Sequence, residues 1–201
     1  MALTPYYEEN GITIYHGDCR EILPHLEPVD LVLTDPPYGL GRTDPVRQPR
    51  GTMNWDSAIP GPDVFSELLR IGRHQIIWGG NYFPLPPRKG FFVWDKEQPE
   101  NFSLAMCEMA WSSIDKPAKL FRYSVRLYTD RQHPTEKPEA LMRWCLNFMP
   151  DAQTILDPFM GSGTTLRAAK DLGRKAIGIE IEEKYCEIAV NRLRQEVICF
   201  E

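Results

Sequence analysis

The chain has 201 residues, a formal net charge of −5, 42% hydrophobic residues and 25% charged residues. These values fit one soluble globular domain over residues 1–201 and argue against a uniformly basic nucleic-acid binder. No run of about eighteen apolar residues predicts a membrane helix, and residues 1–10 lack the pattern of a secretory signal, so a cytoplasmic location is expected. The cysteines and histidines are scattered without metal-ligand spacing, so no metal is expected.

Apolar runs alternate with amphipathic stretches along the chain, which is the pattern of an α/β domain. Strands are expected at 12–16, 31–34, 75–78, 91–94, 154–156 and 176–179, with "LAMCEMAW" and "KLFRYSVRLY" also strand-like. Helices are expected at 62–71, 138–148, 164–172 and 183–195. A stretch rich in Gly, Pro and Arg follows the second strand, and residues 39–56 within it are predicted to form a mobile loop.

The first motif, "LTDPPYGL" at 33–40, is an apolar strand that ends in an acid and two prolines. Proline has no N–H for a sheet ladder, so the strand must stop at this point. Here the carboxylate of Asp35 and the carbonyl of Pro36 can accept both N–H bonds of an exocyclic amino group and draw its delocalised lone pair toward an electrophile. Pro36 and Pro37 hold the acceptors rigidly, and Tyr38 is expected to stack on a nucleobase flipped out of a duplex.

The second motif, "ILDPFMGSGTT" at 155–165, is a strand that passes through two glycines into a helix. Such a turn lets a ligand approach the backbone closely. The motif lacks the Gly-Lys-Ser/Thr of a phosphate loop and the third glycine of the dinucleotide fingerprint. Glu180 lies about 20 residues beyond Gly161, at the spacing where an acid meets a ribose hydroxyl pair, so an adenosine-type cofactor is predicted.

A nucleotide-cofactor oxidoreductase on a Rossmann-like sheet is an alternative from a different class. It would explain Gly161, Gly163 and Glu180. It would leave Asp35 and Tyr38 without a chemical role.

With both motifs in view, the sequence resembles the S-adenosylmethionine-dependent DNA amino-methyltransferases of adenine N6 or cytosine N4. Five segments carry the resemblance: "HGDC" at 16–19, "DPPYG" at 35–39, "HPTEKP" at 133–138, "DPFMGSGTT" at 157–165 and "GIEIEEKY" at 178–185. The catalytic motif precedes the cofactor motif, which is similar to the permuted β class. The resemblance implies a Rossmann-like doubly wound seven-stranded mixed sheet and a small bacterial or phage-encoded enzyme.

The resemblance also implies roles for individual residues. The catalytic residues would be Asp35, Pro36, Pro37 and Tyr38. S-adenosylmethionine would be bound by Asp18, Cys19, Thr135, Lys137, Asp157, Phe159, Gly161, Ser162, Gly163, Thr164 and Glu180. Within that set, Asp18 and Cys19 would meet the adenine of the cofactor, and Thr135 and Lys137 its methionine carboxylate.

Double-stranded DNA is the expected partner, bound by one chain or by a homodimer. Between residues 116 and 143, seven basic residues stand against three acids, so the local charge is positive although the total is negative. The predicted DNA contacts are Arg42, Arg47, Arg50, Lys116, Lys119, Arg122 and Arg126. Residues 39–56 are expected to close over the flipped base, and residues 97–132 leave room for only a reduced target-recognition region.

Adenine N6 is chosen as the target because the family tends to place Asp before Pro-Pro-Tyr in adenine enzymes and Ser in cytosine-N4 enzymes. Cytosine N4 is the alternative, since both bases carry an aromatic amine that Asp35 can engage. RNA and a protein glutamine amide also present a planar NH2 group, but the basic loop and the motif order favour DNA.

Overall fold

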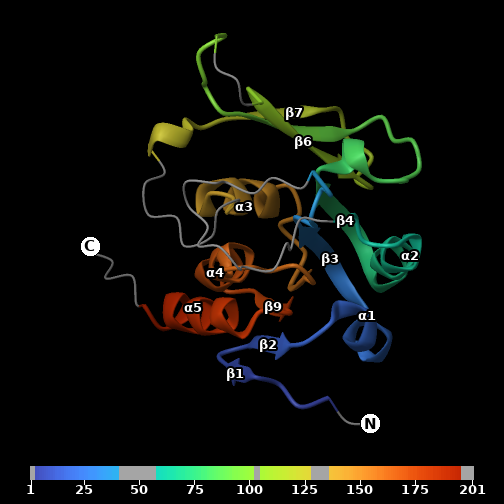
Figure 1. Cartoon of the computed structure of the whole chain (residues 1–201), viewed down its shortest axis with the longest axis vertical. Helices are drawn as coiled ribbons and strands as arrows, with labels where there is room; N and C mark the ends of the chain where they lie inside the picture. The colour runs from blue at the N-terminus through green and yellow to red at the C-terminus, as the bar shows by residue number, and fades with distance from the viewer. Residues whose placement is uncertain (1–2, 41–57, 102–104, 128–135, 196–201) are drawn as a thin grey trace.

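The computed structural model describes residues 3–40, 58–101, 105–127 and 136–195, and a mixed sheet runs through them (Figure 1). Its strands are β1 (Tyr7–Glu9), β2 (Ile12–His16), β3 (Val29–Thr34), β4 (Gly72–Trp78), β5 (Phe91–Asp95), β6 (Cys107–Ser112), β7 (Lys119–Arg122), β8 (Thr154–Asp157) and β9 (Lys175–Glu180). The longer helices are α2 (Pro62–Ile71), α3 (Glu139–Asn147), α4 (Thr164–Asp171) and α5 (Glu183–Arg194). The short helical segments are α1 (Cys19–Ile22), η1 (Leu23–His25), η2 (Gly80–Tyr82) and η3 (Val125–Leu127).

The sheet of the described residues has nine strands in the order β1-β2-β9-β8-β3-β4-β6-β5-β7. The five strands from β2 to β4 in this order are parallel, and β6 is antiparallel to both of its neighbours. The doubly wound α/β class is as expected, but the expected count of seven strands is wrong. The difference lies in short edge strands: β1 turns into β2 through Asn10 and Gly11, whose φ angles of 51° and 79° suit a tight hairpin, and β7 adds four residues beside β5.

The strands and helices predicted from periodicity form at or near the expected residues. In α2, Pro62 occupies the first turn, and Val64, Leu68 and Ile71 fall on one buried face. The helix α1 was not predicted because its four residues are too few to show a period. It forms where Asp18 accepts the backbone N–H of Arg20 at 2.9 Å.

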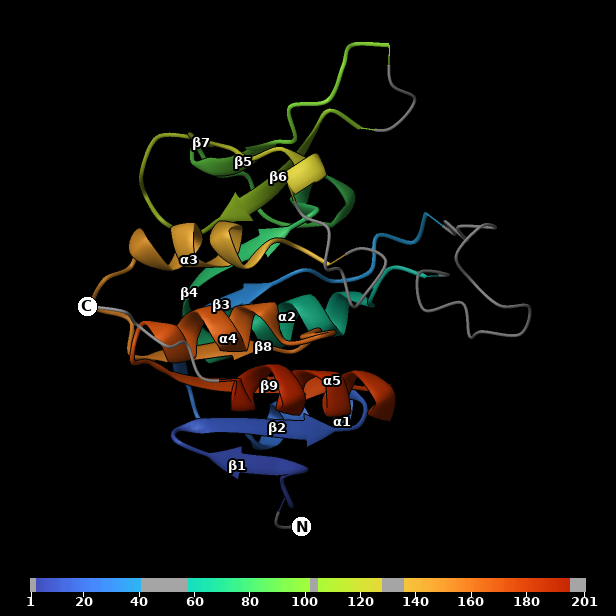
Figure 2. The same cartoon turned by 90° about the vertical axis from the view of Figure 1, so that its left-hand side faces the viewer.

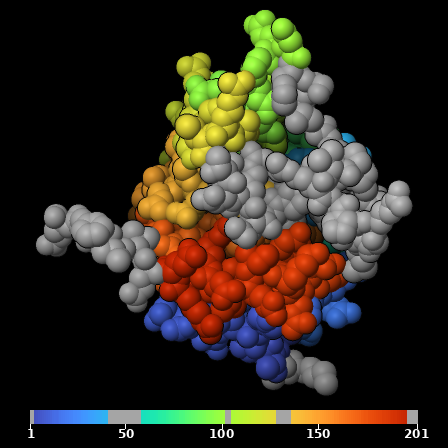
Figure 3. Space-filling model, turned by 60° about the vertical axis from the view of Figure 1, so that its left-hand side comes forward, coloured from blue at the N-terminus to red at the C-terminus, as the bar shows by residue number. Residues whose placement is uncertain are grey.

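Helices cover both faces of the sheet. The cores place α3, α4 and α5 on one face and α1 and α2 on the other, an arrangement that can be followed in Figure 2. Figure 3 shows the outer surface of α5, in red, above the N-terminal strands, in blue. Both faces of the central strands are therefore buried, and Leu31, Val32 and Leu33 of β3 are fully covered.

The order of the strands reverses between β3 and β8, which are parallel neighbours with Leu31 beside Ile155. From β8 the chain enters α4 on one face, whereas the helix that links β3 to β4 packs on the other. In sheets of this kind ligands bind at the carboxyl ends of the strands beside such a reversal. The two sequence motifs follow these two strands.

Candidate active site

A cavity of about 380 Å³ lies at the carboxyl ends of β3, β8 and β9. Its wall consists of Gly17, Asp18, Cys19, Asp35, Pro37, Glu136, Lys137, Met142, Asp157, Pro158, Phe159, Met160, Gly161, Ser162, Thr164, Thr165, Ile179, Glu180, Ile181, Glu182 and Tyr185. The acids that end the two motif strands, Asp35 and Asp157, therefore share one cavity. The hydroxyl of Thr34 ties the strand ends together by donating to Asp157 Oδ1 at 2.7 Å.

Asp157 is buried at the start of the glycine turn. Its Oδ1 accepts the hydroxyl of Thr34 and the backbone N–H of Phe159, at 2.7 and 3.2 Å. Burial raises the pKa of Asp157 to about 6, although these hydrogen bonds and one from Thr165 oppose the shift. The turn itself needs glycine, because Gly163 has a φ of 79° where it precedes α4.

Glu180 lies across the cavity at the end of β9. Its Oε2 accepts the backbone N–H of Gly161 at 3.0 Å, and its Oε1 accepts that of Glu182 at 2.9 Å. Burial is the main reason that its pKa is raised. Two backbone donors fix the carboxylate at the cavity wall, and its further lone pairs can accept hydrogen bonds from a ligand.

Asp18 and Cys19 form another part of the wall, where β2 passes into α1. Asp18 caps α1 and is paired with Arg20, whose hydrogen bonds lower the pKa of the carboxyl. Burial raises the pKa of the Cys19 thiol to about 12, so this side chain is an uncharged wall group.

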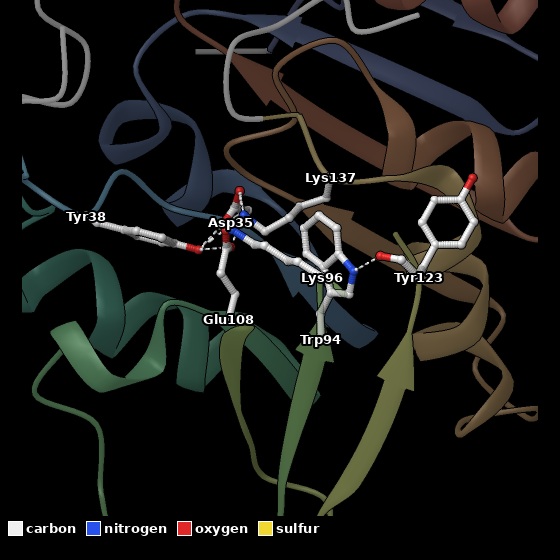
Figure 4. A network of polar contacts seen from close by, with 7 residues as sticks. All are labelled: Asp35, Tyr38, Trp94, Lys96, Glu108, Tyr123 and Lys137. Atoms are coloured by element: carbon white, nitrogen blue, oxygen red, sulfur yellow. Dashed lines mark hydrogen bonds and ion pairs between the residues drawn. The ribbon is translucent and has the colours of Figure 1, made fainter. Parts of the chain in front are cut away.

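Asp35 is the centre of a network of charged side chains (Figure 4). Lys137 Nζ lies 2.5 Å from Asp35 Oδ2 and 2.9 Å from Glu108 Oε2. Tyr38 donates its hydroxyl to Asp35 Oδ1 at 2.6 Å and approaches Glu108 Oε2 at 3.3 Å. Lys96 forms an ion pair with Glu108 Oε1.

The charges of this network balance as two carboxylates and two ammonium groups. Burial raises the pKa of Asp35. The charge of Lys137 opposes this rise, and the charge of Glu108 reinforces it. Burial acts against the charge of Lys137, but Asp35 and Glu108 outweigh it and raise the pKa of the ammonium. Burial also acts against the charge of Glu108, yet Lys137 and Lys96 lower its pKa to about 2. Lys137 thus remains charged beside Asp35.

Tyr38 packs on aromatic rings of the protein. Its ring stacks on Tyr82 with 4.9 Å between centroids and meets Phe83 edge-on at 6.1 Å. Gly79, with a φ of 73°, lies so close that a Cβ at this position would overlap the Tyr38 ring. The predicted stacking of Tyr38 on a flipped base therefore has to use the ring surface that these neighbours leave accessible.

Most of the predicted site residues described by the structure line the cavity. Asp18, Cys19, Lys137, Asp157, Phe159, Gly161, Ser162, Thr164 and Glu180 are wall residues, as are Asp35 and Pro37. Pro36, Tyr38 and Gly163 lie beside the wall rather than in it. Thr135 lies outside the described residues. Lys137 contacts Asp35 and Glu108, so its predicted hold on the methionine carboxylate stays a prediction.

Sequence reasoning missed several polar residues of the site. Glu108 and Lys96 join Asp35 from β6 and from the residue after β5, inside stretches whose only visible pattern was that of strands. Glu136 was also missed: it accepts the hydroxyl of Ser162 at 2.7 Å and pairs with Arg192 at 2.7 Å. Its position next to Lys137 in "HPTEKP" was the available signal.

Four of the seven predicted DNA contacts are described by the structure, and they are spread between the two edges of the sheet. Arg42, Arg47 and Arg50, with most of the loop 39–56, lie outside the described residues. β7 is parallel to β5, so Arg122 lies beside Asp95 at the edge of the sheet that carries the cavity. Lys119 begins the same strand, nearer the opposite edge, and Lys116 reaches the carbonyl of Phe148 at 3.5 Å. Arg126 comes after β7 in the chain and lies in η3.

The predicted recognition region, 97–132, contains β6, β7 and η3 in its described part. Its strands β6 and β7, together with β5, extend the sheet beyond β4. In the described ranges no helix is long and apolar enough to cross a membrane. The same residues contain no group of three side chains able to hold a metal ion.

Comparisons with known proteins identify relatives of this chain. The family of N6/N4 methyltransferases described as "DNA methylase" matches residues 92–191. Type II methyltransferase M.HinfI of Haemophilus influenzae is 30% identical over 91% of this chain and 68% of its own length. Type II methyltransferase M.ScaI of Streptomyces caespitosus is 26% identical over 96% of this chain and 84% of its own length.

Solved structures extend the likeness to the fold. The crystal structure of the M1.HpyAVI–SAM complex is 27% identical, with a TM-score of 0.59 over 90% of this chain and 100% of that one. The cytosine-N4-specific PvuII DNA methyltransferase shares the fold at 18% identity, with a TM-score of 0.65 over 98% of this chain and 91% of that one. The oxidoreductase alternative finds no support in these matches. This chain belongs to the family of DNA methyltransferases that use S-adenosylmethionine to methylate adenine N6 or cytosine N4.

Proposed function

We propose that the chain methylates adenine N6 at a specific site in double-stranded DNA, with Asp35 as the acceptor for the target amine. The observation that carries this proposal is the shared cavity of Asp35, Asp157 and Glu180 at the β3–β8 reversal. An acceptor for an amine and a pocket for an adenosine-type cofactor meet there.

The buried acceptors in the cavity wall suit S-adenosylmethionine. A Cβ at Gly178 would overlap Met160, so the absence of a side chain there keeps β9 close to the turn after β8. Glu180 is the proposed acceptor for the ribose hydroxyls, and Asp18 and Cys19 would border the adenine. When bound, S-adenosylmethionine supplies an electrophilic methyl group on a sulfonium.

The other proposed cofactor contacts come from the glycine turn and the segment before α3. Asp157, Phe159, Gly161, Ser162, Gly163 and Thr164 would surround the cofactor from the turn, and Thr135 and Lys137 would meet it from the other side. Asp157 accepts hydrogen bonds from Thr34 and Phe159 and faces no described cation at ion-pair distance, which suits an environment for a positively charged ligand group.

Asp35 has two tasks in this proposal. Its carboxylate accepts an N–H bond of the target amine and orients the nitrogen lone pair, while the carbonyl of Pro36 accepts the second N–H. After the nitrogen gains the methyl group it must lose a proton, and the carboxylate of Asp35 receives it. Burial raises the pKa of Asp35, which makes it a better base for that proton than an exposed carboxylate.

Arg122 and Arg126 are proposed DNA contacts, because β7 ends at the edge of the sheet that carries Asp35 and Arg126 follows it in η3. Phosphate contacts of this kind add affinity without reading sequence. The loop 39–56, with Arg42, Arg47 and Arg50, is proposed to close over the flipped base, and a homodimer is proposed to supply further recognition. Protease protection of this loop by cofactor together with DNA tests the closure.

Adenine is proposed over cytosine because Asp, rather than Ser, precedes Pro-Pro-Tyr. The test is expression in a host without DNA methylation, followed by mass spectrometry of the nucleosides. N6-methyladenine is the expected product. Detection of N4-methylcytosine alone would show that the target is cytosine N4 and not adenine N6. Sequencing the same DNA for modified bases then gives the recognition site.

A further inference from the structure

Both carboxylate oxygens of Asp35 are occupied by donors of the protein. Tyr38 donates to Oδ1 at 2.6 Å, and Lys137 Nζ lies 2.5 Å from Oδ2 (Figure 4). Each carboxylate oxygen can accept a second hydrogen bond, but a target amine that donates to Asp35 competes with these two groups for its oxygens. The side chain of Lys137 is only 4% exposed, so water offers little compensation where the amine displaces the ammonium.

Glu108 is placed to receive both displaced donors. Its Oε2 lies 2.9 Å from Lys137 Nζ and 3.3 Å from the Tyr38 hydroxyl. Its other oxygen is held by Lys96, which comes from the residue after β5. The side chains of Lys96 and Glu108 are 13% and 21% exposed, so this pair is fixed within the protein rather than on its surface.

We propose that Glu108 is a positioning residue for methyl transfer: it holds Lys137 and Tyr38 while the target amine occupies Asp35. The inference rests on the proposed role of Asp35 in amine methylation. A buried ammonium that leaves one carboxylate needs another within reach, and Glu108 already contacts it. Lys96 keeps Glu108 charged and oriented for that exchange.

The charges around Asp35 predict the direction in which its pKa should change when a neighbour is replaced. Lys137 comes from the segment before α3, Tyr38 from the loop of Asp35 itself, and Glu108 from β6, with Asp157 facing from β8. The charge of Glu108 raises the pKa of Asp35 and that of Lys137 lowers it. Removing Glu108 should lower the pKa of Asp35, whereas removing Lys96 leaves an excess negative charge and should raise it.

The main test compares Glu108→Gln with Lys96→Met in the full chain. The Gln variant leaves Lys137 with Asp35 as its remaining charged partner in the network, so the single-turnover rate should fall about tenfold or more. Its affinity for S-adenosylmethionine should change less than about twofold, because Glu108 is not a wall residue of the cavity. Glu108→Asp, which keeps the charge, should recover part of the rate.

The pH dependence separates positioning from mere support of the fold. The acid limb of kcat/KM should move to lower pH in Glu108→Gln and to higher pH in Lys96→Met. Glu8→Gln, on the exposed edge strand β1, is the matched control and should leave the limb unchanged. Unchanged limbs, or shifts of the same sign in both variants, would overturn the proposal.

NMR titration of the Asp35 carboxyl carbon gives the same comparison without catalysis. The pKa of Asp35 should be lower in Glu108→Gln and higher in Lys96→Met than in the unaltered chain. Should the unaltered chain methylate no amine in DNA, the proposed function fails while the titration still reports the network. Should it methylate DNA and Glu108→Gln retain its full rate, the positioning role alone fails. If Glu108→Gln does not fold, Lys96→Met decides by the sign of its own shift.

Discussion

Two pairs of acids, three in the cavity wall and Glu108 beside it, lie in opposite electrostatic settings. At the catalytic end, Asp35 and Glu108 are joined to Lys137 and Lys96 in a balanced cluster. At the cofactor end, the hydrogen bonds to Asp157 come from hydroxyls and a backbone N–H, and those to Glu180 come from backbone N–H groups.

This difference indicates how each end works. The cofactor end keeps buried acceptors ready for hydroxyl and cationic groups of a ligand, and its acids carry raised pKa values as a consequence of burial. At the catalytic end, charged and hydroxyl partners from the protein already contact both oxygens of Asp35, so a target amine competes with them. Catalysis and cofactor binding should therefore respond separately to substitutions at the two ends.

The largest expected effect comes from Asp35→Ala at the catalytic end. Methyl transfer should fall by about 10²–10⁴, because an acceptor and proton-accepting base is lost. The affinity for S-adenosylmethionine, measured by calorimetry, should change less than about twofold. Asp151→Ala, at an exposed turn, is the control and should keep full activity. Full activity in the Asp35 variant would remove the catalytic assignment.

The second effect concerns pH and the cofactor end. Since the pKa of Asp157 is raised to about 6, the folded protein keeps a proton that the unfolded chain releases between about pH 4 and pH 6. The free energy of unfolding should therefore fall as pH rises through this window, by at most about 3 kcal/mol from this group.

Asp157→Asn should flatten that dependence, because the amide oxygen can still accept from Thr34 and Phe159 without titrating. Urea unfolding of the ligand-free protein at several pH values measures the effect. Glu180, whose pKa is also raised by burial, should leave a smaller residual slope of the same sign. An unchanged slope in the variant would show that Asp157 is not the titrating group.

The third effect is on affinity. Asp157→Ala removes the acceptor of two hydrogen bonds and a wall residue of the cavity, and should weaken S-adenosylmethionine binding about tenfold or more. At saturating cofactor the transfer rate should recover in large part, unlike that of the Asp35 variant. Loss of rate without loss of affinity would erase the distinction between the two ends.

The cofactor end could be predicted from the sequence more completely than the catalytic end. Asp157 and Glu180 follow directly from a strand, glycine turn and helix with a fixed spacing, and the family and cofactor inferred from these motifs are confirmed. Asp35 was evident for the same local reason. The rest of its network was not, because pairing between β5 and β6 brings Glu108 and Lys96 to Lys137 and Tyr38, and no local pattern encodes that pairing.

The sheet shows the same limit. The central strands are long apolar runs and were predicted, and β7 lies within the stretch "KLFRYSVRLY" that was expected to be strand-like. β1 was missed because an edge strand of three residues has little periodicity to detect. The basic stretch from 116 to 143 was interpreted as one region of positive charge. The parallel pairing of β7 with β5 separates Lys119 from Arg122 along the strand, which the charge count did not indicate.

The smallest effect tests which end of the cavity faces DNA. Arg122 lies on the catalytic side, and Lys184 lies beside the cofactor end, where it pairs with Glu182 at 3.5 Å. If DNA enters at the catalytic end, Arg122→Ala should reduce the slope of log affinity against log salt by about 0.9, the value of one phosphate contact. Lys184→Ala should leave the slope unchanged, and fluorescence anisotropy at several salt concentrations measures both. The reverse result would place the duplex over the cofactor end, where a base flipped toward Asp35 would have to pass the cofactor first.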